Sequence, residues 1–109
     1  MRPTITPSQK KIYEKIIEEA TMDCHDEYEQ IAGWQCILDE YINTPCKCII
    51  GKEEVILEKI DIVDNCNAVV GVLKFNKTRL RVLIQDVILE NQKAMVYIDA
   101  YKHWCKEGC

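Results

Sequence analysis

The sequence predicts an α+β fold in which two N-terminal helices precede a small antiparallel sheet and a third helix ends the chain. Its length of 109 residues suits one hydrophobic core. The apolar residues are spaced as in helices before Pro45, they change there to short β-branched runs, and helical spacing returns near Asn91. We therefore expect a single domain, 1–109, with a helical part over 7–43, a sheet over 46–90 and a C-terminal helix over 91–106.

The first helix has a recognisable start. Thr6 can cap it, Pro7 suits the first helical position, and Gln9 completes a capping box with Thr6. Apolar residues then follow at helical spacing, namely Ile12, Ile16, Ile17 and Ala20.

The second helix is predicted to begin at Asp26, with Glu29 three residues later as the partner in a second capping box. Its apolar stripe consists of Tyr28, Ile31, Trp34, Leu38 and Ile42. Gly33 lies inside this helix, where it costs about 1 kcal/mol relative to Ala. Such a glycine indicates that another element approaches the helix closely. We also expect Trp34 to share one core with Trp104 of the C-terminal helix.

Several short strands, separated by turns rich in Gly, Asn and Asp, are predicted between the helices. They cover Cys46–Ile50, Val55–Val63, Ala68–Phe75 and Arg79–Leu83, and a helical turn with a last strand is expected over 84–90. So few short strands need further cover at this size. We expect a small SH3-like barrel, partly open, or a strongly bent sheet, with helices over its open side.

Acidic residues are concentrated in the first half of the chain. The net charge is −4, which argues against ordinary binding to nucleic-acid phosphates. No Lys or Arg occurs between Lys15 and Lys47. That interval holds Glu18, Glu19, Asp23, Asp26, Glu27, Glu29, Asp39 and Glu40. The stretch is either a solvated helical face or a place where a cation or a basic partner relieves repulsion between carboxylates.

Seven cysteines, an odd number, occur in a chain without a recognisable signal segment, which predicts reduced thiols in a cytoplasmic protein. Their spacing lacks the two close pairs typical of structural zinc sites. We expect Cys36, Cys48 and Cys66 to serve as small apolar residues. No apolar run approaches the roughly 20 residues of a membrane span.

Two stretches resemble a known family. Residues 26–38, DEYEQIAGWQCIL, and residues 45–49, PCKCI, resemble the acidic–EQ–x2–GW–x3–L…P–x2–C signature of the CcbP-type calcium-binding proteins, small proteins first known from cyanobacteria. The second stretch runs from Arg79-Leu80-Arg81-Val82 to a C-terminal helix with Trp104 and Gly108. The resemblance extends over roughly residues 10–109 and implies calcium binding.

Calcium binds six to eight oxygen ligands, and the sequence contains no EF-hand loop to supply them. We expect a discontinuous site at the break between the first two helices, with Asp23, Asp26, Glu27 and Glu29 as ligands. Asp64, with the amide oxygens of the neighbouring asparagines, is a second candidate. Asp and Asn are also common turn formers, so that segment is equally interpreted as a simple turn.

The sequence contains no acid–base pair, phosphate loop or catalytic triad, so we do not expect an enzyme. The predicted function is a small acidic calcium-binding protein, a buffer or weak sensor. The alternatives are a non-catalytic protein-interaction module or an acidic inhibitor or decoy that binds a basic protein surface. No binding to nucleic acid or to membranes is expected.

Overall fold

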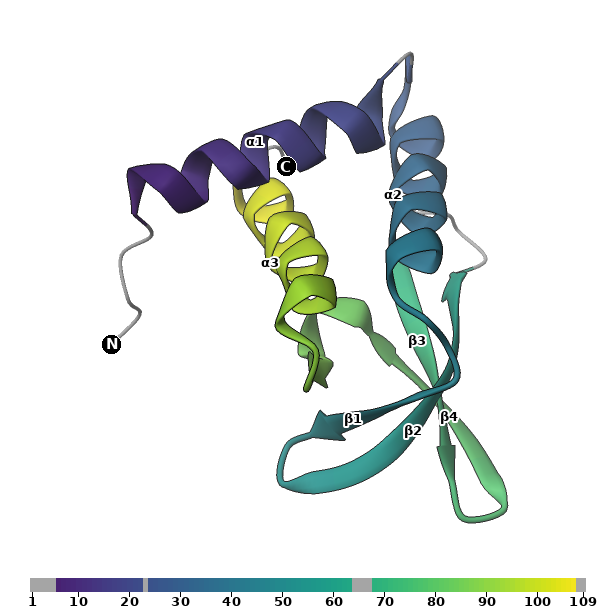
Figure 1. Cartoon of the computed structure of the whole chain (residues 1–109). Coiled ribbons are helices and arrows are strands. Elements are labelled where there is room, and N and C mark those ends of the chain that lie inside the picture. Colours follow the sequence, from purple (N-terminus) through teal and green to yellow (C-terminus); the bar gives the residue numbers. More distant parts are fainter. Residues whose placement is uncertain (1–5, 23, 64–67, 108–109) are drawn as a thin grey trace.

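Three helices lie above a bent, five-stranded antiparallel sheet in the computed structural model, which describes residues 6–22, 24–63 and 68–107 (Figure 1). The elements are α1 (Pro7–Thr21), α2 (Glu27–Tyr41), β1 (Cys46–Ile50), β2 (Glu53–Ile62), β3 (Val69–Phe75), β4 (Thr78–Leu83), the 3₁₀ turn η1 (Ile84–Asp86), β5 (Ile88–Leu89) and α3 (Gln92–Glu107). The predicted fold class is confirmed. No helix in the described ranges has the length and apolar composition of a membrane span.

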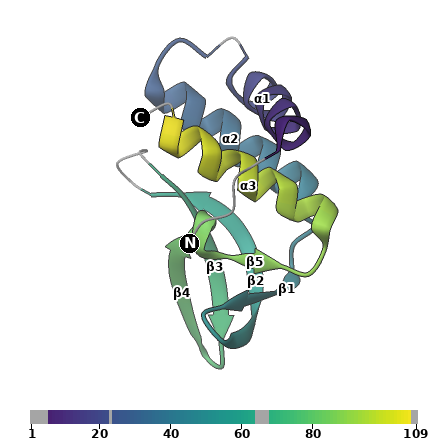
Figure 2. The ribbon, with the colours of Figure 1, turned by 90° about the vertical axis from the view of Figure 1, so that its left-hand side faces the viewer.

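The strands are arranged in the order β4-β3-β2-β1-β5, and every neighbouring pair is antiparallel. The outermost strands, β4 and β5, do not pair with each other in the described part of the chain, so the sheet is not a closed barrel, and of the two expected forms the bent, open sheet is the one found. Strand β5 contains only two residues and cannot supply the hydrogen bonds that closure requires. The helices cover the sheet instead, as Figure 2 shows from the side.

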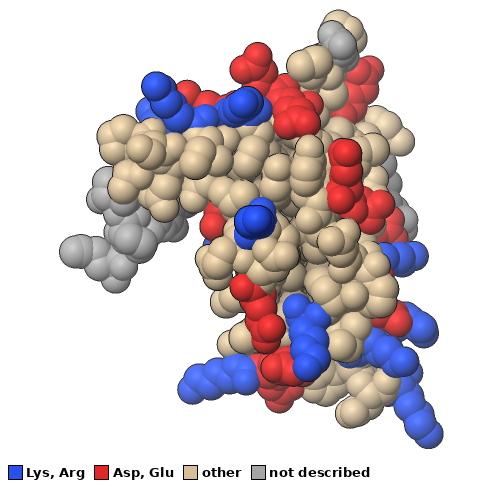
Figure 3. Space-filling model, viewed as in Figure 1, with Lys and Arg blue, Asp and Glu red and all other residues tan. Residues whose placement is uncertain are grey.

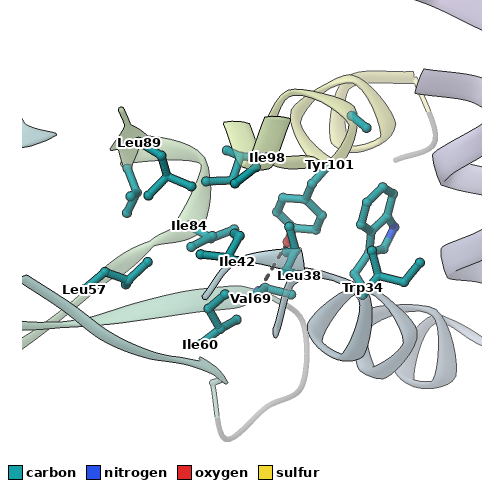
Figure 4. Close-up of a cluster of buried hydrophobic side chains, with 14 of the residues drawn as sticks. Trp34, Leu38, Ile42, Leu57, Ile60, Val69, Ile84, Leu89, Ile98 and Tyr101 are labelled. Atoms are coloured by element: carbon teal, nitrogen blue, oxygen red, sulfur yellow. Dashed lines mark hydrogen bonds between the residues drawn. The ribbon is translucent and has the colours of Figure 1, made fainter. Parts of the chain in front are cut away.

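The core lies between the helices and the sheet (Figure 4). Trp34 and Leu38 of α2, Ile42 at its C-cap, and Ile98 and Tyr101 of α3 are almost fully buried there. They pack with Leu57, Val69, Ile84 and Leu89 from the sheet side. The backbone N–H of Val69 donates a hydrogen bond of 3.2 Å to the Tyr101 hydroxyl, which fixes α3 to the start of β3.

The two tryptophans share this core, as predicted. Trp34 is fully buried, and its ring lies 5.3 Å from Tyr101 in an edge-to-face arrangement and 5.8 Å from Trp104. Trp104 is half-buried at the margin of the cluster. The aromatic rings therefore hold α2 against α3.

Some predicted core positions were wrong because helical spacing alone does not say which turns have a neighbour. Tyr28 lies in the first turn of α2, ahead of the packed part, and is 61% exposed. Cys36 is exposed on the outer side of the same helix. In α1 the buried side chain is Tyr13 rather than Ile12. The sequence also predicts a buried strand over Ala68–Phe75, but Phe75 is exposed because β3 extends beyond the cover of the helices.

Candidate metal site at the α1–α2 junction

The junction between α1 and α2 depends on a close contact between their backbones. The capping box at Thr6 and Gln9 starts α1 as predicted, with hydrogen bonds of 3.0 and 3.1 Å. At the other end of α1, the carbonyl oxygen of Ala20 lies where a β-carbon of Gly33 would stand. The predicted close approach at Gly33 is confirmed, and it places the end of α1 beside the first turns of α2.

Asp26 and Glu29 bind the backbone at the start of α2. The Asp26 Oδ1 accepts a hydrogen bond of 2.8 Å from the N–H of Glu29, so Asp26 is the N-cap as predicted. The Glu29 Oε2 accepts a hydrogen bond of 3.1 Å from the N–H of His25, one residue earlier than a capping box requires. The predicted capping box is therefore wrong in its second half. Each carboxylate keeps its other oxygen for a ligand.

The remaining predicted ligands are distributed as follows. Glu27 is exposed in the first turn of α2, between the two capping residues. Asp23 and Asp64 lie outside the described residues. The structure thus places three of the five predicted ligands within one helical turn.

Carboxylates around the junction lack basic neighbours. Four ion pairs occur within the described residues, and all four lie in the sheet: Lys47–Glu54, Lys59–Asp61, Arg79–Glu58 and Arg81–Asp61. The last turn of α1 holds no basic residue, although the negative end of the helix dipole favours one there. In Figure 3 acidic side chains gather where α1 meets the top of α2, and many basic ones project from the sheet below. The junction is therefore a place of negative potential.

Backbone carbonyl groups add further oxygen atoms that the sequence could not reveal. The Cys24 Sγ lies 3.8, 3.5 and 3.3 Å from the carbonyl oxygens of Ala20, Met22 and Glu29. Carboxylate and carbonyl oxygens are the donors that Ca²⁺ prefers, so the donor chemistry fits this ion. In the described ranges no three His, Cys, Asp or Glu side chains converge as a ready metal site. Calcium binding here would have to draw the carboxylates together.

The end of β2 differs from the helix junction. Asp61 lies there, and its Oδ1 accepts a hydrogen bond of 2.8 Å from the N–H of Ile62. Its Oδ2 lies 3.4 Å from the Arg81 guanidinium and 4.0 Å from Lys59 Nζ. This carboxylate is already neutralised by bases, which makes it a poor cation ligand.

Among the described residues, the cysteines do not gather into a second metal site. Cys36, Cys46 and Cys48 are free thiols. Burial, together with the neighbouring Cys46, raises the pKa of the Cys48 thiol to about 11. A thiol with so high a pKa is a poor nucleophile and a poor metal ligand at neutral pH. Cys48 therefore acts as the small apolar residue that the sequence predicts, whereas Cys66 lies outside the described residues.

Comparison with known proteins gives a match in structure but not in sequence. No protein-family model and no curated protein sequence matches this chain. The crystal structure of Anabaena CcbP superposes with a TM-score of 0.77 and 17% identity, over 99% of this chain and 98% of that one. A calcium-binding protein in its calcium-binding form superposes with a TM-score of 0.75 and 16% identity, over 95% and 98%. The resemblance seen in the sequence is thus confirmed at the level of structure: from α1 to α3 this chain has the fold of Anabaena CcbP.

Proposed function

We propose that this chain is a non-catalytic, cytoplasmic calcium-binding protein that serves as a buffer or weak sensor. The observation that carries the proposal is the structural likeness, over almost the entire chain, to Anabaena CcbP and to a calcium-binding protein in its calcium-binding form. The binding site that we propose is the α1–α2 junction, with Asp26, Glu27 and Glu29 as ligands and Asp23 contributed by the linker. Asp64, after β2, is proposed as a weaker second site.

Electrostatics at the junction support this location. Three carboxylates lie within one turn and make no ion pair in the described structure. A divalent cation would remove their mutual repulsion and would also lie at the negative end of the α1 dipole. Since the ligands are not preassembled, we expect micromolar or weaker affinity. Magnesium should compete poorly, because it requires a tighter octahedron than separate surface carboxylates provide.

Proton–nitrogen NMR spectroscopy tests the proposal. Calcium, magnesium and zinc are added in separate titrations to the full chain, and the amide signals are followed. Calcium should shift the signals of residues 18–30 progressively, and the melting temperature should rise because the ion binds the folded state only. Magnesium at the same concentration should produce much smaller shifts.

A pair of variants locates the site. Asp26→Asn, Glu27→Gln and Glu29→Gln, combined in one variant, should abolish the calcium shifts at the junction. The fold should survive because Asn is as good an N-cap as Asp. The control is Asp39→Asn with Glu40→Gln, which removes exposed carboxylates from the other end of α2 and should leave calcium binding unchanged. The proposal is wrong if several millimolar calcium moves neither these amides nor the melting temperature.

A further inference from the structure

The β3–β4 hairpin has a feature that calcium binding does not use. Residues 69–83 contain four basic residues and no acidic one. These bases are Lys74, Lys77, Arg79 and Arg81. Strand β4 forms one edge of the sheet, and β3 is its only substantial neighbour among the described elements. One side of β4 therefore offers unpaired backbone groups to a further strand.

The two arginines of β4 and the exposed Leu80 lie on opposite faces of the sheet edge. In the β3–β4 register Arg79 lies opposite Lys74, and Arg81 lies opposite Val72. Because side chains alternate along a strand, both arginines project from one face and Leu80 and Val82 from the other. Leu80 is 50% exposed, and its partner Leu73 is buried in the core. The edge thus presents the two arginines, with Leu83 at the end of the strand, on one face, and Leu80 and Val82 on the face that continues into the core.

The four basic residues of the hairpin outnumber the two carboxylates that pair with them. Arg79 Nε lies 2.6 Å from Glu58 Oε1, and Arg81 pairs with Asp61 at 3.4 Å. Lys74 and Lys77 make no ion pair in the described structure, and Lys74 lies directly across from Arg79. Like charges opposite one another destabilise a sheet, and an added carboxylate would relieve them.

We propose that β4 is a docking edge for an extended segment of another protein in which acidic and apolar residues alternate. The added strand would pair with β4 through backbone hydrogen bonds. Its acidic side chains would lie beside Arg79 and Arg81, and its apolar side chains would lie beside Leu80. This inference is independent of the calcium site, which lies at the helix junction.

A second copy of this chain fits the same edge poorly. Two β4 strands related by a two-fold axis pair antiparallel, and residues that lie opposite each other have their side chains on the same face of the sheet. Every such register between the middles of the strands sets an arginine against an arginine or against Lys77. The repulsion disfavours self-pairing and favours an acidic partner.

Short capped peptides test the proposal on the unaltered protein. One peptide alternates Glu with Val, the second alternates Glu with Pro at equal charge, and the third alternates Lys with Val. The Glu/Val peptide should shift amide signals along β4 and slow the hydrogen exchange of Arg79 and Arg81. The exchange rate of the Leu80 amide should change less. After a two-residue turn, the N–H groups of successive residues point alternately toward the partner strand and toward the free edge, and the N–H of Leu80 points toward β3. The other two peptides should not bind.

Charge reversal gives a second test. Arg79→Glu with Arg81→Glu should weaken binding of the Glu/Val peptide by about tenfold or more. The milder Arg79→Gln with Arg81→Gln should weaken it less and guards against misfolding. Lys93→Glu with Lys102→Glu on α3 makes the same charge change at exposed positions and should have little effect.

Four results would overturn the proposal. The first is that the Glu/Val peptide does not bind at millimolar concentration, and the second is that the Glu/Pro peptide binds equally well. The third is that the β4 amide signals shift with protein concentration when no peptide is present. The fourth is that single-stranded DNA or anionic vesicles bind the same arginines more tightly than the peptide does, without protecting their amides. The second result would mean charge alone, the third a second copy of this chain, and the fourth a polyanion.

Discussion

The α1–α2 pair and the β3–β4 hairpin carry opposite charge and balance it in different ways. Residues 7–43 hold nine acidic and three basic residues, and the three bases all lie in the first part of α1. Residues 69–83 contain basic residues and no acidic one, but the two arginines reach carboxylates on β2. A sheet lets long side chains reach across its face to carboxylates on another strand, whereas the outer side of a helix pair has no such strand beside it. The helical acids consequently remain available to a cation.

Packing separates the same two regions. The helices contribute Trp34 and Tyr101 to the centre of the core, whereas β4 has five exposed residues out of six. Stability should therefore depend far more on the helical side, and the hairpin should tolerate change. Four predictions test or refine this contrast, beginning with the largest expected effect.

Removing a side chain from each region should give very different losses of stability. Trp34→Ala should lower the free energy of unfolding by about 3–5 kcal/mol, because a fully buried ring is replaced by a cavity. Leu80→Ala should lower it by less than about 1 kcal/mol, since half of that side chain is already exposed. Urea unfolding of both variants measures the difference. Similar losses would show that the hairpin is as important to the core as α2.

A β-carbon added to a glycine should likewise be costly only among the helices. Gly33→Ala should cost about 2–3 kcal/mol, because its β-carbon would clash with the Ala20 carbonyl, a backbone group that cannot rotate away. In β3, Gly71→Ala would meet the Leu57 Cδ1 at 2.8 Å, the end of a flexible side chain. That variant should cost about 1 kcal/mol. Equal costs in urea unfolding would mean that α1 shifts easily along α2.

The sequence predicted the fold well because its periodicities are strong. The change of spacing near Pro45 and the return near Asn91 locate the sheet to within a few residues. The Gly33 contact was also predictable, since an interior helix glycine requires a reason. Closure of the sheet was not predictable, because it depends on the two-residue length of β5 rather than on hydrophobic pattern.

The candidate site was less accessible to sequence reasoning. Asp26 and Glu29 look alike as acidic residues, but their hydrogen bonds to backbone N–H groups become visible only in three dimensions. The carbonyl oxygens of Ala20 and Met22 have no sequence signature, since every residue carries one. The strand order has no signature in the sequence either, so the position of the basic strand β4 at an edge of the sheet becomes visible only in three dimensions.

Capping should matter more than any single ion pair of the sheet. Asp26→Ala removes the acceptor for the Glu29 N–H and should cost about 1 kcal/mol, whereas Asp26→Asn should cost almost nothing. Arg79→Gln removes an exposed ion pair to Glu58 and should cost about 0.5 kcal/mol or less. Thermal unfolding in low salt compares the three variants. A larger loss for Arg79→Gln would show that charge pairing, and not helix capping, dominates at the surface.

The smallest expected effect concerns Asp99, on α3. Burial raises the pKa of its carboxyl group above the usual value, and Lys102 opposes that rise. Since the folded protein then binds the proton more tightly than the unfolded chain, the charged carboxylate weakens folding at neutral pH. The folded protein regains that stability as the pH falls through the raised pKa toward about 4. Asp99→Asn should therefore be more stable than the parent at pH 7, by less than about 1 kcal/mol because the site is partly exposed.

The pH dependence distinguishes this cause from a simple change in packing. The advantage of Asp99→Asn should shrink as the pH approaches 4, because the parent carboxyl group becomes neutral as well. Lys102→Gln should have the opposite effect at neutral pH, since it removes the charge that opposes the rise in pKa. Urea unfolding of the parent and both variants between pH 4 and pH 7 measures both trends. If Asp99→Asn is less stable at pH 7, the carboxylate accepts a favourable contact that outweighs its burial. In that case at least one carboxylate of the helices would be stabilised by a contact within the protein, as the carboxylates of the sheet are.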